Sequence, residues 1–169
     1  MMGQETGKAF EKALTFLERR SRTESEVRER LGRAGFKEDV IAETLDRLRD
    51  AGLVDDEDYA ERYLETLKAK GRGQRRIADE MRRKGLPEDI VRNRVEQDIT
   101  REDEMTAASE IAERMLEQLG GRPSCSAEEP ADDWETMQKK MQKINRKLVS
   151  LGYPYEIVGD VMSKLRSKL

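Results

Sequence analysis

The chain has 169 residues and no histidine, which excludes Cys/His zinc sites and both Ser-His-Asp and Cys-His nucleophilic arrangements. Charged residues make up 41% of it and aromatic residues 5%, a composition typical of an elongated repeat protein with thin cores rather than of a single globule. It has one cysteine, no apolar run near the roughly 20 residues that span a bilayer, and no apolar secretory signal at its N-terminus, so we expect a cytoplasmic protein without membrane attachment.

Helical signals begin close to the N-terminus. The first is an apolar stripe with a period of 3.6 residues, formed by Phe10, Ala13, Leu14 and Leu17. Thr23 and Glu26 then have the spacing of a capping box, which predicts the start of a second helix. Val27 and Leu31 follow at i,i+4 and would share one buried face of that helix.

The pattern at the end of this second helix occurs three times. Its copies are Leu31-x3-Gly35-Phe36-x3-Val40-Ile41, Met81-x3-Gly85-Leu86-x3-Ile90-Val91 and Leu148-x3-Gly152-Tyr153-x3-Ile157-Val158. The glycine can enter the left-handed conformation that closes a helix, and the apolar residue after it would fold back as in a Schellman motif. Each copy therefore predicts two helices joined by a tight turn, and the repetition indicates one structural unit used three times.

A further helix precedes each of the other two copies. Their apolar stripes are Tyr59, Ala60, Tyr63, Leu64 and Leu67, and then Ala108, Ile111, Ala112, Met115, Leu116 and Leu119. Asp55 and Asp58 place acid at a helix start, and Pro87 and Pro154 suit the beginning of the last helix of their copies. No stretch alternates with period two, so the predicted fold is all-α: three-helix repeats at 8–53, 54–98 and 101–169, stacked in a row.

The third repeat contains an insert at about 120–133, GGRPSCSAEEPADD, whose Gly, Pro, Ser and acidic residues predict a flexible segment. Cys125 lies within it and is interpreted as an exposed thiol without a role. Trp134 is expected to begin the next helix and to pack its ring on the third repeat, rather than to form a binding hot spot.

Charge is distributed unevenly along the chain, although the net charge is only −3. Residues 68–86 and 137–169 each carry a net charge of +6, whereas residues 101–135 between them carry −8. Such basic segments suit phosphates or an acidic protein groove, and the alternative is a solvated helix face. The candidate partner-binding residues are Arg72, Arg75, Arg76, Arg82, Arg83, Lys84, Lys139, Lys140, Lys143, Arg146 and Lys147.

Helical rotation places Arg76 and Arg83 on one stripe of the middle basic helix, and we expect both side chains to be exposed. Arg75 and Arg82 share the neighbouring stripe, away from the buried pair. Few aromatic residues lie among them, which disfavours stacking on single-stranded nucleic acid. The chain has no P-loop or GxGxxG motif, and its carboxylates have the spacing of solvated helix faces. The sequence therefore argues against an enzyme and predicts no cofactor and no metal.

Three stretches of the chain resemble the bacterial RecX family of recombination regulators. They are Ala13-Leu14-x2-Leu17-x-Arg19-x-Ser21-Arg22-x2-Ser25-Glu26-Val27-Arg28-x2-Leu31-x3-Gly35-Phe36, then Leu48-x3-Gly52-Leu53-Val54-Asp55-Asp56-x2-Tyr59-Ala60-x2-Tyr63, then Gly71-x-Gly73-x2-Arg76-Ile77-x2-Glu80-Met81-x2-Lys84-Gly85-Leu86. The third repeat resembles the family through Leu148-x3-Gly152-Tyr153 and Ile157. Gln74 departs from the family pattern, which commonly has proline there, and the 120–133 insert is longer than usual.

This resemblance implies three-helix repeats arranged as a curved rod, and a non-enzymatic regulator of the RecA recombinase. Such proteins bind along the groove of the RecA filament on single-stranded DNA and lower its ATPase, strand-exchange and co-protease activities in DNA repair and the SOS response. Some members also contact DNA, which the basic segments would permit. The resemblance supplies no contact residues, so the candidates above rest on charge alone.

Two other functions remain as alternatives. A direct nucleic-acid binder of the helix-turn-helix type also uses a short helix, a glycine turn and a second helix. The net negative charge and the lack of a dimerisation element speak against a dedicated operator reader and favour a monomer. A scaffold for some other acidic partner is the third possibility.

Overall fold

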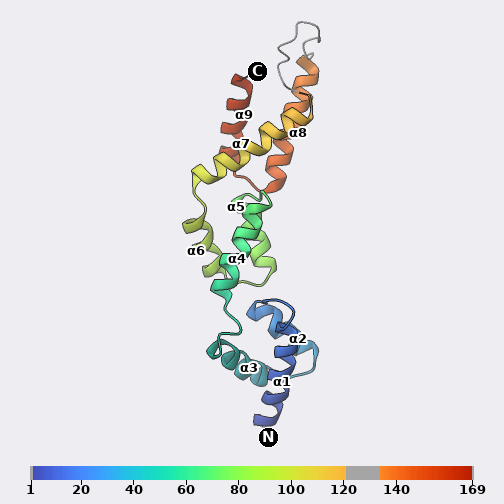
Figure 1. Cartoon of the computed structure of the whole chain (residues 1–169), viewed down its shortest axis with the longest axis vertical. Helices are drawn as coiled ribbons and strands as arrows, with labels where there is room; N and C mark the ends of the chain where they lie inside the picture. The colour runs from blue at the N-terminus through green and yellow to red at the C-terminus, as the bar shows by residue number, and fades with distance from the viewer. Residues whose placement is uncertain (1, 121–133, 169) are drawn as a thin grey trace. The chain divides into compact units, whose positions relative to one another are not determined.

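The computed structural model describes residues 2–120 and 134–168, and every regular element in those ranges is an α-helix (Figure 1). The helices follow one another in groups of three. The first group is α1 (Met2–Leu17), α2 (Glu24–Arg33) and α3 (Glu38–Asp50); the second is α4 (Asp56–Ala69), α5 (Gln74–Arg83) and α6 (Glu88–Asp98); the third is α7 (Arg101–Gln118), α8 (Trp134–Leu151) and α9 (Tyr155–Ser167). The predicted all-α fold of tandem three-helix repeats is confirmed. The predicted insert and Cys125 lie outside the described residues, apart from Gly120.

The local signals in the sequence act as expected. Thr23 caps α2, because its hydroxyl accepts from the Glu26 amide while the Glu26 carboxylate accepts from the Thr23 amide. Each repeated glycine has a positive φ. The amide of the residue after it donates a hydrogen bond of 3.3 Å to the carbonyl five residues earlier, as a Schellman motif requires. These bonds run from Phe36 to Leu31, from Leu86 to Met81 and from Tyr153 to Leu148.

The chain forms two compact units, and the middle group of helices contributes to both. The first unit comprises Met1–Glu65 and Asp79–Arg94, and the second comprises Thr66–Ala78 and Val95–Leu169. Helix α5 therefore gives its first half to the second unit and its second half to the first. In the first unit α1, α2 and α3 pack on one another, and in the second α7, α8 and α9 do the same (Figure 1).

Each unit has a core of apolar side chains taken from the repeated pattern. The core of the first unit consists of Ala9, Ala13, Val27, Leu31, Val40, Ile41, Leu45, Leu48 and Val54. That of the second includes Ala108, Ala112, Met141, Ile144, Leu148, Tyr153, Ile157, Val158, Val161, Met162 and Leu165. The i,i+4 pairs read from the sequence are thus the buried pairs of α2 and α8.

In the first unit the start of α2 is attached to the group of helices that follows it. We call this set of contacts the first junction. The Glu24 amide donates to the Asp56 carboxylate in the first turn of α4 over 2.8 Å. The Thr23 hydroxyl donates to the Lys84 carbonyl in the turn between α5 and α6 over 2.7 Å. The Lys84 ammonium also lies 3.3 Å from the Glu26 carboxylate.

In the second unit the start of α5 is attached in the same manner, and we call these contacts the second junction. The Gln74 amide donates to the Glu104 carboxylate in the first turn of α7 over 2.8 Å. The Gly73 amide donates to the Leu151 carbonyl at the end of α8 over 2.9 Å. Glu104 is only 6% exposed, so its carboxylate satisfies a helix amide in a largely dry environment.

The two junctions share one plan. In each, an amide in the first turn of a group's second helix, that of Glu24 or Gln74, meets a carboxylate from the next group's first helix. The same helix end also meets the closing glycine of the next group, Gly85 or Gly152. A Cβ added to Gly85 would lie 2.3 Å from the Ser25 hydroxyl oxygen, which shows how closely the two segments approach.

Glycine is required for the close approach in the second junction. A Cβ on Gly73 would lie 2.5 Å from the Tyr153 backbone nitrogen, and one on Gly152 would lie 2.4 Å from the Arg76 backbone nitrogen. The Arg75 amide donates to the Gly152 carbonyl across this contact over 3.1 Å. Neither backbone can withdraw without losing a hydrogen bond, so a side chain at either glycine would displace the junction.

We predict that Gly73→Ala destabilises the protein by more than about 1 kcal/mol, because its Cβ would overlap backbone atoms. Gly159→Ala is the matched control: Gly159 lies inside α9 with nothing within 4 Å of an added Cβ, and its replacement should stabilise by about 0.5–1 kcal/mol. Urea unfolding followed by far-UV circular dichroism measures both changes. Equal stability of the two variants would contradict the packing described for the second junction.

A second prediction concerns the ionisation of Glu104. Burial raises the pKa of Glu104, although the Gln74 amide and the Arg75 charge oppose that rise. A carboxyl whose folded-state pKa is raised contributes most to stability below its unfolded pKa of about 4.3, and that contribution is lost as pH rises through the folded pKa. Glu104→Gln keeps an acceptor and removes the ionisation, so we expect it to be at least as stable as the parent at pH 7, with a smaller advantage near pH 4.

Glu104→Ala is the comparison for this experiment. It leaves the Gln74 amide without its acceptor and should cost about 1–3 kcal/mol at both pH values. The free energy of unfolding is measured for all three proteins at each pH. A Glu104→Gln variant that is less stable than the parent at pH 7 would show that the second junction needs the charged carboxylate.

Candidate partner-binding surfaces

The basic residues of the middle segment are divided between the two compact units. Arg72, Arg75 and Arg76 belong to the second unit, and Arg82, Arg83 and Lys84 belong to the first. The sequence predicts neighbouring stripes of one helix for Arg75, Arg76, Arg82 and Arg83, but the surroundings of these residues differ.

The three cations in the first unit differ in their contacts and in their exposure to solvent. Arg82 is held by a two-point contact with Glu88, at 2.7 and 2.8 Å, and this contact raises the pKa of Arg82 and lowers that of Glu88. Lys84 is half-buried against Glu26 in the first junction. Arg83 is exposed, as predicted.

Two of the three cations in the second unit, Arg75 and Arg76, lie beside the α8–α9 turn. Arg75 is exposed, and its guanidinium carbon lies 4.8 Å from the centre of the Tyr155 ring, a cation–π contact. Arg76 is half-buried because its backbone and Cβ lie against Gly152, and Arg72 is half-buried too. The predicted exposure of Arg76 is wrong, because helical rotation within one repeat cannot show what the next repeat covers.

The basic residues of α8 form a more continuous surface. Lys139, Lys143 and Lys147 are spaced by four residues, share one stripe of the helix and are all exposed. Lys139 lies 4.0 Å from Glu135. Lys140 is half-buried and donates to the Gly120 carbonyl over 3.4 Å.

A shallow hollow of about 500 Å³ lies beside this stripe, between α7 and α8. Lys143, Arg146 and Lys147 line it together with Met115 and Leu119. Within residues 2–120 and 134–168, no carboxylate lies within ion-pair distance of Lys143 or Lys147. We call Lys143, Arg146 and Lys147 the α8 basic surface. The charges of this surface are available to phosphates or to carboxylates of a partner.

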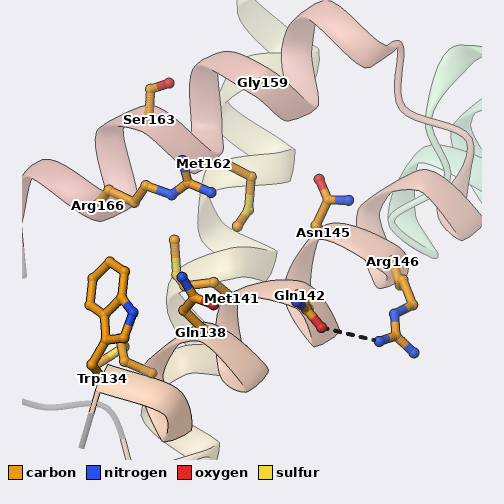
Figure 2. A pocket seen from close by; sticks show the side chains of 11 residues that line it. Trp134, Gln138, Met141, Gln142, Asn145, Arg146, Gly159, Met162, Ser163 and Arg166 are labelled. Carbon is orange, nitrogen blue, oxygen red and sulfur yellow. Dashed lines mark hydrogen bonds between the residues drawn. The ribbon is translucent and has the colours of Figure 1, made fainter. Parts of the chain in front are cut away.

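A groove in the second unit lies between α8 and α9 and has a volume of about 1300 Å³ (Figure 2). Trp134, Met137, Met141 and Met162 form its apolar lining, and Arg166 reaches along one side. Trp134 begins α8 as predicted, but it is 73% exposed, so the prediction that its ring packs on the third repeat is wrong. We call this feature the α8–α9 groove.

The sequence did not indicate this groove. Met141 and Met162 have the spacing of core residues and are largely buried in the core. They also line the groove, but the sequence pattern that predicts a core position does not distinguish this second role. The sequence shows Arg166 only as one of the charges of a basic segment, with no indication that it lines a groove. The relevant signal in the sequence was the tryptophan at a predicted helix start, and only the structure shows that it is exposed.

The described residues do not assemble a group of three or more His, Cys, Asp or Glu side chains that would suit a metal ion. Among the same residues, no helix is both long enough and apolar enough to cross a membrane. Burial raises the pKa of Tyr153 to about 12, and its hydroxyl donates to the Gly71 carbonyl over 3.2 Å, so this tyrosine acts as a structural donor.

These features define a class: an all-α protein of tandem three-helix repeats with exposed basic surfaces. Family models describe the same units, since "RecX, first three-helix domain" matches residues 9–48 and "RecX, second three-helix domain" matches residues 55–93. The regulatory protein RecX of Mycobacterium sp. (strain KMS) is 32% identical over 89% of this chain and 77% of its own length. That of Clostridium botulinum (strain Eklund 17B / Type B) is 31% identical over 93% of this chain and 68% of its own length. The chain belongs to the RecX family of regulatory proteins.

Solved structures agree on the fold. The crystal structure of RecX from Lactobacillus salivarius matches with a TM-score of 0.80 and 24% identity, over 97% of this chain and 98% of that one. A second regulatory protein RecX matches with a TM-score of 0.74 and 22% identity, over 96% of this chain and 73% of that one. The chain also spans about two thirds of the length of the clostridial relatives.

A matched pair of charge reversals tests the placement of the two arginines on α5. Arg83→Glu should change the free energy of unfolding by no more than about 0.5 kcal/mol, because Arg83 is exposed. Arg76→Glu should cost more than about 1 kcal/mol, because Arg76 packs against the α8–α9 turn. Urea unfolding of both variants gives the comparison, and equal losses would show that Arg76 has no packing role.

Proposed function

We propose that this chain binds the RecA filament on single-stranded DNA and lowers its recombinase, ATPase and co-protease activities, acting without catalysis of its own. Membership of the RecX family, over most of the chain, is the observation that carries the proposal. Its relatives are named regulatory proteins, which supports a binding role rather than an enzymatic one. The proposal includes a cytoplasmic monomer without membrane attachment.

Physically, regulation needs only a difference in affinity between two states of the filament. A ligand shifts an equilibrium by the ratio of its affinities for the two states, so a protein that prefers one filament state changes activity without contacting the nucleotide. The α8 basic surface supports this role, since Lys143, Arg146 and Lys147 offer exposed cations to an acidic protein groove. Arg75 and Arg83 are further exposed candidates, one in each unit.

The alternative is direct binding to nucleic acid. The α8 basic surface favours it, because a row of exposed lysines also matches a phosphate backbone. The net charge of −3 opposes general attraction to DNA. A DNA binder of this size would bind bare DNA tightly at low salt and lose affinity steeply as salt is added.

We predict that the chain binds RecA-coated single-stranded DNA more tightly than the same DNA bare at near-physiological salt, and that it lowers the DNA-dependent ATPase of RecA. Co-sedimentation and ATP turnover measure the two effects. Lys143→Glu with Lys147→Glu should weaken both, because it reverses the α8 basic surface. Lys12→Glu with Lys37→Glu is the control, since it changes the net charge equally at exposed sites in the first unit.

The outcomes separate the two functions. Equal affinity for bare and coated DNA would favour the nucleic-acid alternative. An unchanged ATPase without co-sedimentation would remove the RecA proposal altogether. Equal losses in the two double variants would show that net charge, rather than the α8 basic surface, determines binding.

A further inference from the structure

The α8–α9 groove occupies the face that, in the first group of helices, meets the next helix of the chain. The register is set by the closing glycines, Gly35 in the first group and Gly152 in the third. Counted from these glycines, Met141, Gln142, Met162 and Arg166 correspond to Glu24, Ser25, Leu45 and Arg49. All four residues of the third group line the groove.

In the first unit this face meets an acidic helix start. The first turn of α4 carries Asp56, Glu57 and Asp58, and the Asp56 carboxylate accepts the Glu24 amide. Arg49 lies 3.5 Å from the Glu24 carboxylate. Burial raises the pKa of Asp56 and the Arg49 charge opposes that rise, so this arginine faces the same acidic turn. The first turn of α7, which meets the start of α5, is acidic too, with Glu102, Asp103 and Glu104.

The corresponding face of α8–α9 is open among the described residues. Trp134 is 73% exposed at its edge, and the groove has a volume of about 1300 Å³ (Figure 2). Three methionines and a tryptophan line this face. Methionine-rich grooves suit helical partners because the flexible thioether adapts to their side chains.

One feature of α8 changes the way a carboxylate would be held. Helix α8 begins at Trp134, seven residues before Met141, whereas α2 begins at Glu24, the position that corresponds to Met141. The amide that binds a carboxylate in α2 therefore lies inside α8, where it takes part in the helix. Arg166, the counterpart of Arg49, is exposed and is the cation left to receive the acid.

We propose that the α8–α9 groove binds an amphipathic helix of a partner protein, with the apolar stripe of that helix on the methionines and Trp134 and its acidic first turn beside Arg166. The groove's lining favours protein over nucleic acid, because a phosphate backbone needs several cations and this lining has Arg166 and, at the far end, Arg146, whose side chain points away from the methionines (Figure 2). The inference goes beyond the RecA proposal and does not depend on it, since it defines the partner by its chemistry.

The test uses the full-length chain, in which Trp134 is the only tryptophan, so its emission reports on the groove directly. The probe is a synthetic peptide of residues 55–70 with blocked ends, whose acidic start is the one that meets α2–α3 in this protein. In this peptide Glu65 is replaced by lysine, and a lactam joins that lysine side chain to the Glu61 carboxylate. Both positions are exposed, and the lactam keeps the short peptide helical. The control peptide carries Asp56→Asn, Glu57→Gln and Asp58→Asn.

We expect the peptide to move the Trp134 emission to shorter wavelength in a saturable manner. The control peptide should bind about fivefold more weakly, and the Arg166→Glu protein should lose a similar factor for the acidic peptide. Lys164→Glu, an exposed change of the same charge on the same helix but outside the groove, should stay within about twofold of the parent.

Three results would overturn the inference. One is the absence of a saturable shift at millimolar peptide. Another is an equal effect of Arg166→Glu and Lys164→Glu, which would mean that general charge attracts the peptide. The last is tighter saturation by a single-stranded oligonucleotide than by the peptide at the same salt, which would make the groove a nucleic-acid site.

Discussion

The structure depends on a contact in which a carboxylate from one group of helices accepts the amide at the start of a helix in the group before it. Helix starts carry amides without intrahelical partners, and a buried start needs an acceptor from elsewhere. Asp56 supplies that acceptor to Glu24, and Glu104 supplies it to Gln74. Repetition of the contact joins each group of helices to the next through polar groups, which suits a chain with 41% charged residues.

The contact also explains why the two compact units do not coincide with the groups of helices. Each junction ties a helix start to the first helix and to the closing turn of the following group. The second half of α5, with the turn at Gly85, therefore belongs with α2, while the first half of α5 belongs with α7 and the α8–α9 turn. The middle group is shared because it takes part in both junctions. It supplies the Asp56 carboxylate to the first junction, and its Gln74 amide donates to the Glu104 carboxylate in the second.

The same constraint divides the basic residues into two kinds: those that take part in the junctions, and those whose side chains are exposed and can contact a partner. Arg76 and Lys84 lie in the junctions and are half-buried, whereas Lys143 and Lys147 are exposed on α8. A regulator that works by binding needs cations of the second kind, because their charge is not already satisfied within the protein. The family relationship and the exposed surface of α8 therefore support the same kind of function.

The sequence by itself determined the local structure. The capping box at Thr23, the closing glycines and the i,i+4 apolar pairs each depend on residues within a few positions of one another, so the all-α repeats could be predicted from them. The resemblance of the motifs to RecX was also readable and is confirmed by the comparisons. What only the tertiary structure decided was which exposed positions are covered by another repeat: the half-burial of Arg76, the buried acceptor role of Glu104 and the exposure of Trp134. Helical periodicity reports the face that a helix turns to its own group, but contacts between groups are made at helix ends by residues about 30 to 80 positions apart, and no local pattern records them.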